Sequence, residues 1–212
     1  MGFFRRLVGL EPTKGRAAEY RRLAFTAEEI ARGDYKPFFG GRAAEWTERG
    51  VFQLDFMKEL GLTPSSSLLD VGCGPLRAGV HFIRFLDAGK YAGFDTNRSL
   101  IDAAKHVVAD EGLTAKAPLL LHIKDFDVRK LSGRTFDFVL AFSVIEHCTA
   151  KERRLFLDRI GAATSPGGLV VATHVGWLQA SDLDGTGLEL QPATIDTERQ
   201  GLKKLRVMRR KS

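Results

Sequence analysis

Three acidic residues, each at the end of an apolar run, are the first side chains whose types and spacing suggest chemistry. Asp70 lies at the end of one run and is followed by Gly72 and Gly74. Glycines at this spacing let the main chain turn sharply, and a ligand can approach the backbone where a Cβ would collide. Asp95 ends the next apolar run, and Asp125 follows a third. If these runs are parallel strands, their carboxyl ends share one edge of a sheet, and we expect a ligand site there.

The spacing around the glycines argues against a dinucleotide site. The dinucleotide fingerprint requires Gly-x-Gly-x-x-Gly, but position 77 is Arg and the next glycine is Gly79. A carboxylate at Asp70 can face an ammonium group, and Asp95 lies about 20 residues after the glycines, where an acid binds ribose hydroxyls. Asp125 can accept a hydrogen bond from an adenine amino group. The three acids therefore predict a ligand that carries a cation, a ribose and an adenine rather than a pyrophosphate.

Alternating apolar runs and amphipathic stretches predict the elements that position these acids. Strands are expected at 67–71, 91–95, 118–123, 136–142 and 169–172, with helices at 80–86, 100–108 and 151–163. The turn Pro166–Gly168 precedes the fifth strand, and residues 202–208 are a candidate last strand. This order is typical of an α/β fold: a Rossmann-like, doubly wound, mostly parallel sheet with helices on both faces. Residues 67–212 should form this domain.

Residues 1–66 are expected to form an N-terminal helical arm or lid. Helices are predicted around 15–32 and 47–61, separated by a patch of glycine and aromatic residues at 35–41. The aromatic side chains of this arm could line a pocket for a second ligand or could pack the arm onto the sheet. The residues concerned are Tyr35, Phe38, Phe39 and Trp46.

Leu68–Gly74 resembles the first motif of the class I S-adenosylmethionine-dependent methyltransferases. The later motifs of that family are matched in order by Phe94-Asp95, Asp125-Phe126, Phe136–Val139 and Pro166–Gly168. Residues 143–147 resemble the segment after the fourth strand in the small-molecule branch of the family. The resemblance covers residues 65–175 and implies that 67–212 is an S-adenosylmethionine-binding methyltransferase domain.

The resemblance also implies a set of residues for the cofactor. Asp70 would face its methionine part, Asp95 its ribose, and Asp125 with Phe126 its adenine, while Ser143 would lie near the sulfonium. The full set of implied cofactor-binding residues is Asp70, Gly72, Cys73, Gly74, Asp95, Thr96, Asp125, Phe126 and Ser143. The sequence departs from the family in two places. Leu76 replaces the third glycine of the first motif, and the region after the fifth strand is short for the usual antiparallel hairpin.

Methyl transfer from a sulfonium mainly requires that the protein align a nucleophile with the methyl carbon and exclude water. A general base is needed only if the acceptor is a hydroxyl or a protonated amine. Candidates for this base are Glu146, His147 and His174, in the loops after the fourth and fifth strands. The alternative role for Glu146 and His147 is to order their loop and cap the following helix. No metal site is expected.

Composition limits the remaining alternatives. No apolar run approaches the roughly 18 residues needed to span a bilayer. The amino-terminal residues also lack the apolar region of a secretory signal, so we expect a cytoplasmic protein. Cys73 and Cys148 lack metal-site spacing and are expected to be reduced thiols there. The net charge of +6 is concentrated near the two ends. These basic residues form a solvated surface or, alternatively, attract nucleic acid.

The expected function is methyl transfer to a small-molecule acceptor. A nucleic-acid methyltransferase is the first alternative, but the Asn/Asp-Pro-Pro-aromatic run of base aminomethylases is missing after Phe142. A non-enzymatic S-adenosylmethionine-binding protein is the second alternative, and a nicotinamide oxidoreductase is the most distant one. The oligomeric state is left open by the sequence.

Overall fold

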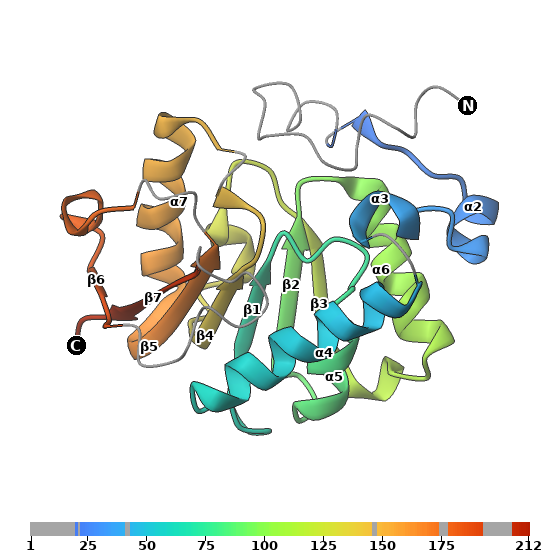
Figure 1. Ribbon diagram of the computed structural model, residues 1–212, viewed down its shortest axis with the longest axis horizontal. Helices are drawn as coiled ribbons and strands as arrows, with labels where there is room; N and C mark the ends of the chain where they lie inside the picture. Colours follow the sequence, from blue (N-terminus) through green and yellow to red (C-terminus); the bar gives the residue numbers. More distant parts are fainter. Residues whose placement is uncertain (1–19, 21, 41–42, 146–147, 174–177, 193–204) are drawn as a thin grey trace.

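A single sheet organises the protein (Figure 1). The computed structural model describes residues 20, 22–40, 43–145, 148–173, 178–192 and 205–212. Within them the strand order is β3-β2-β1-β4-β5-β7-β6. The strands are β1 Leu68–Val71, β2 Tyr91–Asp95, β3 Leu119–His122, β4 Phe136–Ala141, β5 Thr164–Thr173, β6 Leu188–Leu190 and β7 Leu205–Arg210. Neighbours from β3 to β5 are parallel, so the predicted Rossmann-like, mostly parallel α/β fold is confirmed.

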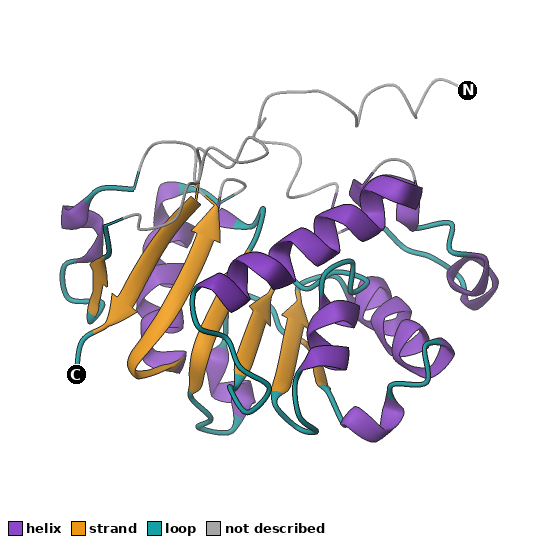
Figure 2. Ribbon diagram, turned by 60° about the horizontal axis from the view of Figure 1, so that its bottom comes forward, coloured by secondary structure: helices purple, strands orange, loops and turns teal. Residues whose placement is uncertain are grey.

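Helices cover both faces of the sheet (Figure 2). Their bounds are α2 Ala27–Arg32, α3 Lys36–Gly40, α4 Ala43–Glu59, α5 Gly79–Phe85, α6 Arg98–Asp110 and α7 Ala150–Ala163. Successive residues of a strand point to opposite faces. Accordingly Leu68 packs in one core cluster with Phe82 of α5, whereas Leu69 packs in another with Phe156 of α7. No helix in the described part of the chain is long and apolar enough to cross a membrane.

Helix α4 joins the arm to the sheet. It was expected at 47–61 and runs from Ala43 to Glu59. Its residues Phe56 and Met57 are buried in the same core cluster as Leu68 of β1, so this helix is packed directly on the sheet domain. The proposed division of the chain at residue 66 remains a prediction.

The segment before α4 differs from its prediction. One helix was expected over 15–32, but in the described residues the chain is not helical from Leu23 to Thr26. Thr26 begins a new helix, α2, because its hydroxyl accepts from the Glu29 N–H while the Glu29 carboxylate accepts from the Thr26 N–H. The patch at 35–41, predicted as a separator, contains the short helix α3. The cap at Thr26 therefore divides the single helix predicted over 15–32.

The far edge of the sheet is an antiparallel hairpin. β7 pairs antiparallel with β5 on one side and with β6 on the other. The sequence predicts a region after β5 that is short for this hairpin, but both strands form. The candidate strand at 202–208 is confirmed from Leu205 and extends to Arg210, while 202–204 lie outside the described residues.

Strand β5 also begins earlier than predicted. Phe136 pairs with Thr164 and Phe138 pairs with Leu169, so the extra residues of β5 form an irregularity in the ladder. Gly167, in the predicted turn, has φ of 76° and accommodates that irregularity. The turn therefore lies inside the strand and not before it.

Gly161 allows a test of how closely α7 packs against the residues before β6. A Cβ on Gly161 would lie 2.4 Å from the backbone oxygen of Thr186, which precedes β6. Helix propensity alone predicts that Gly161→Ala stabilises the protein by about 1 kcal/mol. Because the clashing atom is backbone, we expect the opposite: a loss of about 2 kcal/mol in the free energy of unfolding, measured by urea denaturation. A more stable variant would contradict the contact between α7 and the hairpin.

Candidate functional site

The loop after β1 is shaped by left-handed backbone conformations. Gly72 has φ of 69°, Gly74 51° and Leu76 64°. A Cβ on Gly72 would lie 2.6 Å from Cγ2 of Val144, so this position has no room for a side chain. Leu76 adopts the conformation that its glycine counterpart in the family would take freely. Its side chain is buried in the core cluster of α5 and β1, and this packing offsets the strain of about 1 kcal/mol.

Asp70 is a buried carboxylate beside this loop. Only 6% of the residue is exposed, and its Oδ2 accepts a hydrogen bond of 2.8 Å from the Tyr91 hydroxyl. Burial raises the pKa of Asp70 to about 7; the Tyr91 hydrogen bond opposes this shift, the Asp95 charge adds to it and Arg77 opposes it. The side chain can therefore bind a cation closely, because a positive charge would favour its ionised form.

Asp95 lies at the end of β2 and is 1% exposed. Its Oδ2 accepts from the Gly74 N–H at 3.0 Å and from the Tyr20 hydroxyl at 2.7 Å, and its Oδ1 accepts from the Asn97 N–H at 2.8 Å. Burial raises the pKa of Asp95, and these hydrogen bonds oppose the shift. Asp70 and Asp95 are thus brought together at the glycine loop, as expected from adjacent parallel strands.

The third predicted acid occupies a more open position. Asp125 is exposed in the loop after β3, where it and Phe126 have φ of 55° and 52°. The Phe126 ring is buried and packs edge-on against Phe156 of α7, with 5.2 Å between centroids. Phe126 therefore anchors its loop to α7, and Asp125 is the member of the pair that faces solvent.

The remaining cofactor candidates differ in what they offer. The Cys73 thiol is packed against Gly93, since a Cβ built on Gly93 would lie 3.0 Å from its Sγ, and burial raises the pKa of the thiol. Because the side chain is buried, Cys73 can contact a ligand only through its backbone. Thr96 follows β2, and its carbonyl lies 3.1 Å from Nε2 of His122. Ser143, exposed at the end of β4, has φ of 57° and donates its N–H to the Thr173 hydroxyl. Ser143 therefore links the ends of β4 and β5.

The three predicted base candidates, Glu146, His147 and His174, lie outside the described residues. The helix that follows Glu146 and His147 is α7, which begins at Ala150. The helix is capped by Thr149, whose hydroxyl accepts from the Glu152 N–H while the Glu152 carboxylate accepts from the Thr149 N–H. Thr149 is thus the N-cap of α7, and the alternative role of Glu146 and His147 stays a prediction.

Three residues at this edge were not singled out from the sequence. Tyr20 and Tyr91 donate their hydroxyls to Asp95 and Asp70, and Asn97 caps α6 by accepting from the Leu100 N–H. The cap was detectable, because Asn97 stands directly before a helical pattern. Neither tyrosine had a sequence signal, since each finds its carboxylate through tertiary packing.

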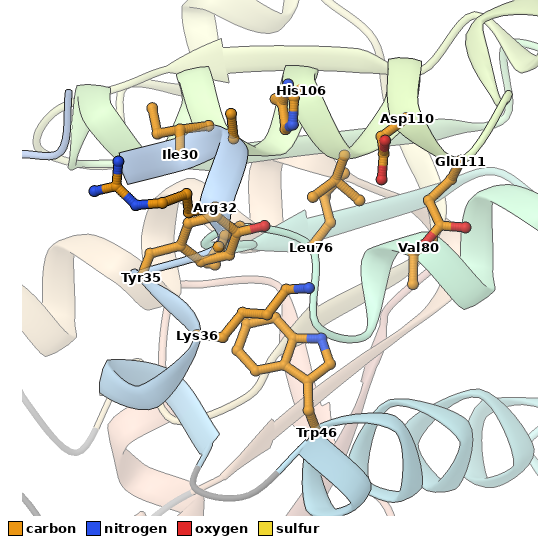
Figure 3. Close-up of a pocket in the computed structure, with 14 residues that line it drawn as sticks. Ile30, Arg32, Tyr35, Lys36, Trp46, Leu76, Val80, His106, Asp110 and Glu111 are labelled. Atoms are coloured by element: carbon orange, nitrogen blue, oxygen red, sulfur yellow. The ribbon is translucent and has the colours of Figure 1, made fainter. Parts of the chain in front are cut away.

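The aromatic residues of the arm pack the arm against α6. Tyr35 is 2% exposed, and it contacts Phe25 and Trp46 at centroid distances of 6.3 and 6.2 Å. Tyr35 and Trp46 also line a cavity of about 100 Å³ together with Leu76 and the acidic end of α6 (Figure 3). Tyr35 and Trp46 therefore pack the arm and also line a cavity, so both predicted roles stay open for them. The Phe39 side chain lies outside what the structure describes.

Comparison with known proteins identifies this domain. Residues 69–170 match a family model described as a methyltransferase domain. A ubiquinone biosynthesis O-methyltransferase of Nitrobacter winogradskyi is 36% identical over 113 residues, which are 50% of this chain and 37% of the relative. A second one, from Bradyrhizobium sp., is 35% identical over 117 residues, 55% of this chain and 42% of the relative. The chain thus spans about two fifths of the length of these curated relatives.

Solved structures agree on the fold. A magnesium protoporphyrin IX methyltransferase from Synechocystis PCC 6803, with bound S-adenosylmethionine, superposes with a TM-score of 0.63 at 12% identity, covering 97% of this chain and 99% of the other. An O-methyltransferase family protein from Burkholderia thailandensis gives 0.62 at 18% identity, covering 93% and 68%. Residues 69–170 are thus matched as a methyltransferase domain, and the order of the motifs agrees with the class I S-adenosylmethionine-dependent type.

Proposed function

We propose that this protein binds S-adenosylmethionine where β1, β2 and β4 end and transfers its methyl group to an oxygen atom of a small molecule. The observation that carries the proposal is the buried Asp95 carboxylate at the end of β2, directly beside the glycine loop. The names of the curated relatives, which are small-molecule O-methyltransferases, support the choice of acceptor.

The described residues fit this cofactor. Asp95 would accept from the ribose hydroxyls, as acids at the end of a second strand do. Asp70, which is buried and has a pKa of about 7, would face the ammonium group. Gly74 leaves its backbone open, since the nearest atom to a Cβ there is the Tyr20 hydroxyl oxygen at 3.9 Å. Thr96, Asp125 and the backbone of Phe126 would surround the adenine.

When bound, S-adenosylmethionine supplies a methyl group on a sulfonium with a good leaving group. The task of the protein is then to hold the acceptor oxygen in line with that methyl group and to exclude water. Ser143 lies at the end of β4, where it would face the reacting groups. An acceptor hydroxyl also needs a base, for which Glu146, His147 and His174 are our candidates.

Thermal unfolding with added S-adenosylhomocysteine or NAD tests the cofactor proposal. At a concentration about 100 times the dissociation constant, S-adenosylhomocysteine should stabilise the protein by about 2.7 kcal/mol. For a domain of this size, that corresponds to a rise in Tm of about 5 °C or more. NAD at the same concentration should leave Tm unchanged. An unchanged Tm with S-adenosylhomocysteine would contradict the cofactor assignment.

Incubation with radiolabelled S-adenosylmethionine tests the acceptor. We expect label in a small-molecule fraction and none in RNA or DNA. The described basic side chains near the carboxyl end support this expectation, because Arg209 donates to the Gly167 carbonyl and Arg210 to the Thr186 carbonyl. Label in nucleic acid would favour the alternative substrate class. Binding without transfer to any acceptor would favour a non-enzymatic role.

We also propose a cytoplasmic location. Cys73 and Cys148 are both free thiols, as expected in a reducing compartment.

A further inference from the structure

A segment of the arm lies across the glycine loop and the end of β2. The Tyr20 hydroxyl donates a hydrogen bond of 2.7 Å to Oδ2 of Asp95, the oxygen that also accepts from the Gly74 N–H. The Tyr20 oxygen is also the nearest atom to a Cβ built on Gly74, at 3.9 Å. The phenol therefore stands over the open side of the glycine loop.

The residues after Tyr20 are fastened to the start of α6. The Asn97 side-chain amide donates to two carbonyls, those of Tyr20 at 2.7 Å and Leu23 at 2.9 Å. The Ser99 hydroxyl accepts from the Phe25 N–H at 2.8 Å and lies 3.3 Å from the Phe25 carbonyl. We call Tyr20 and residues 22–25 the strap. Its hydrogen bonds reach β2 and α6 from a distant part of the sequence, so the strap is held by tertiary contacts.

Tyr20 donates to the carboxylate oxygen of Asp95 that a ribose hydroxyl of the cofactor would need as its acceptor. Oδ1 of Asp95 already accepts from the Asn97 N–H, and Oδ2 is shared by the Gly74 N–H and the Tyr20 hydroxyl. A phenol and a ribose hydroxyl are the same kind of hydrogen-bond donor. Burial and the Asp95 charge raise the pKa of Tyr20 well above its usual value, so the phenol remains a neutral donor. Two such donors cannot occupy one position.

We infer that the strap closes the cofactor site by placing the Tyr20 hydroxyl where a ribose hydroxyl would bind, so that cofactor binding must displace Tyr20. The inference rests on the proposed cofactor and concerns the regulation of its site. Because only the open form binds, the apparent dissociation constant equals the intrinsic one divided by the fraction of open protein. Weakening the strap should therefore tighten cofactor binding.

Binding of S-adenosylhomocysteine to Tyr20→Phe, measured by isothermal titration calorimetry, tests the strap. The variant keeps the ring and loses the hydrogen bond to Asp95, so we expect a dissociation constant about tenfold lower than in the wild type, the value of one hydrogen bond to a carboxylate. Ser99→Ala, which loosens the strap away from the cofactor residues, should change affinity in the same direction. Tyr35→Phe is the matched control, because its hydroxyl is remote from Asp95, and its affinity should equal that of the wild type.

Limited proteolysis gives a readout that is independent of affinity. The sequence offers trypsin two adjacent sites, Arg21 and Arg22, next to Tyr20. Cleavage there should be faster in Tyr20→Phe than in the wild type, and adding S-adenosylhomocysteine should accelerate cleavage of the wild type. Slower cleavage with ligand would mean that the strap closes over the cofactor, and would overturn the inference.

The outcomes separate the two proposals. Equal or weaker binding by Tyr20→Phe, beside normal binding by the wild type, would overturn the strap and leave the cofactor site intact. Binding by neither protein would overturn the proposed cofactor, and the strap's role would fall with it. Tighter binding by Tyr20→Phe together with ligand-accelerated cleavage of the wild type supports both.

Discussion

Asp95→Ala is expected to weaken the binding of S-adenosylhomocysteine by more than about 100-fold, because two ribose hydroxyls lose a charged acceptor and each such bond contributes about 1.5–3 kcal/mol. The Gly74 N–H loses its partner as well, so the loop loses part of its order. The variant also frees Tyr20, but that gain is worth one hydrogen bond and cannot offset the loss. Calorimetric titration of the folded variant measures the effect, and the thermal shift caused by ligand should disappear.

Asp137→Ala is the matched control for this experiment. Asp137 is also an acid of a sheet strand, but it lies at the start of β4, where its carboxylate accepts from the Ser67 N–H and hydroxyl at 2.8 Å each. Its removal should lower stability while leaving the affinity for S-adenosylhomocysteine unchanged. If both variants lost affinity to the same degree, the effect of Asp95→Ala would be a general loss of folding, and the ribose role would be contradicted.

Asp70→Asn should change how the stability of the ligand-free protein depends on pH. The pKa of Asp70 is 3.8 when exposed and about 7 in the folded protein. Between these values the folded state holds a proton that the unfolded state has released, so the free energy of unfolding falls as pH rises. The fall is about 1.4 kcal/mol per pH unit, about 4 kcal/mol at most over the window, and it ends above pH 7.

Asparagine keeps the shape and still accepts from Tyr91, but it carries no charge to desolvate. Urea denaturation should therefore find wild type and variant similar near pH 4, with the variant more stable by up to about 4 kcal/mol at pH 8. The raised pKa of Asp95 changes the stability of both proteins in the same direction, so it does not reverse the difference between them. Parallel stability curves across this range would contradict a raised pKa of Asp70 in the folded protein.

Local pattern was sufficient for the sheet and for two of its acids. Short apolar runs, helical stretches between them and glycines after the first run are short-range signals, and they predicted β1 to β5 and the edge that they share. Asp70 and Asp95 meet there because parallel neighbours align their carboxyl ends. Boundaries such as the early start of β5 escaped prediction, since they depend on how a bulge fits the neighbouring strand.

The amino-acid sequence was enough to identify the class of fold, the order of its motifs and the strand ends that carry Asp70 and Asp95, because each depends on neighbours along the chain or on regular strand alignment. The tertiary structure decided that the Phe126 ring packs on α7, that Thr149 caps that helix, and that Tyr20 reaches Asp95 across 75 positions. A contact over such a separation is selected by the free energy of the whole packed chain, in which burial and hydrogen bonding offset the entropy of closing the loop.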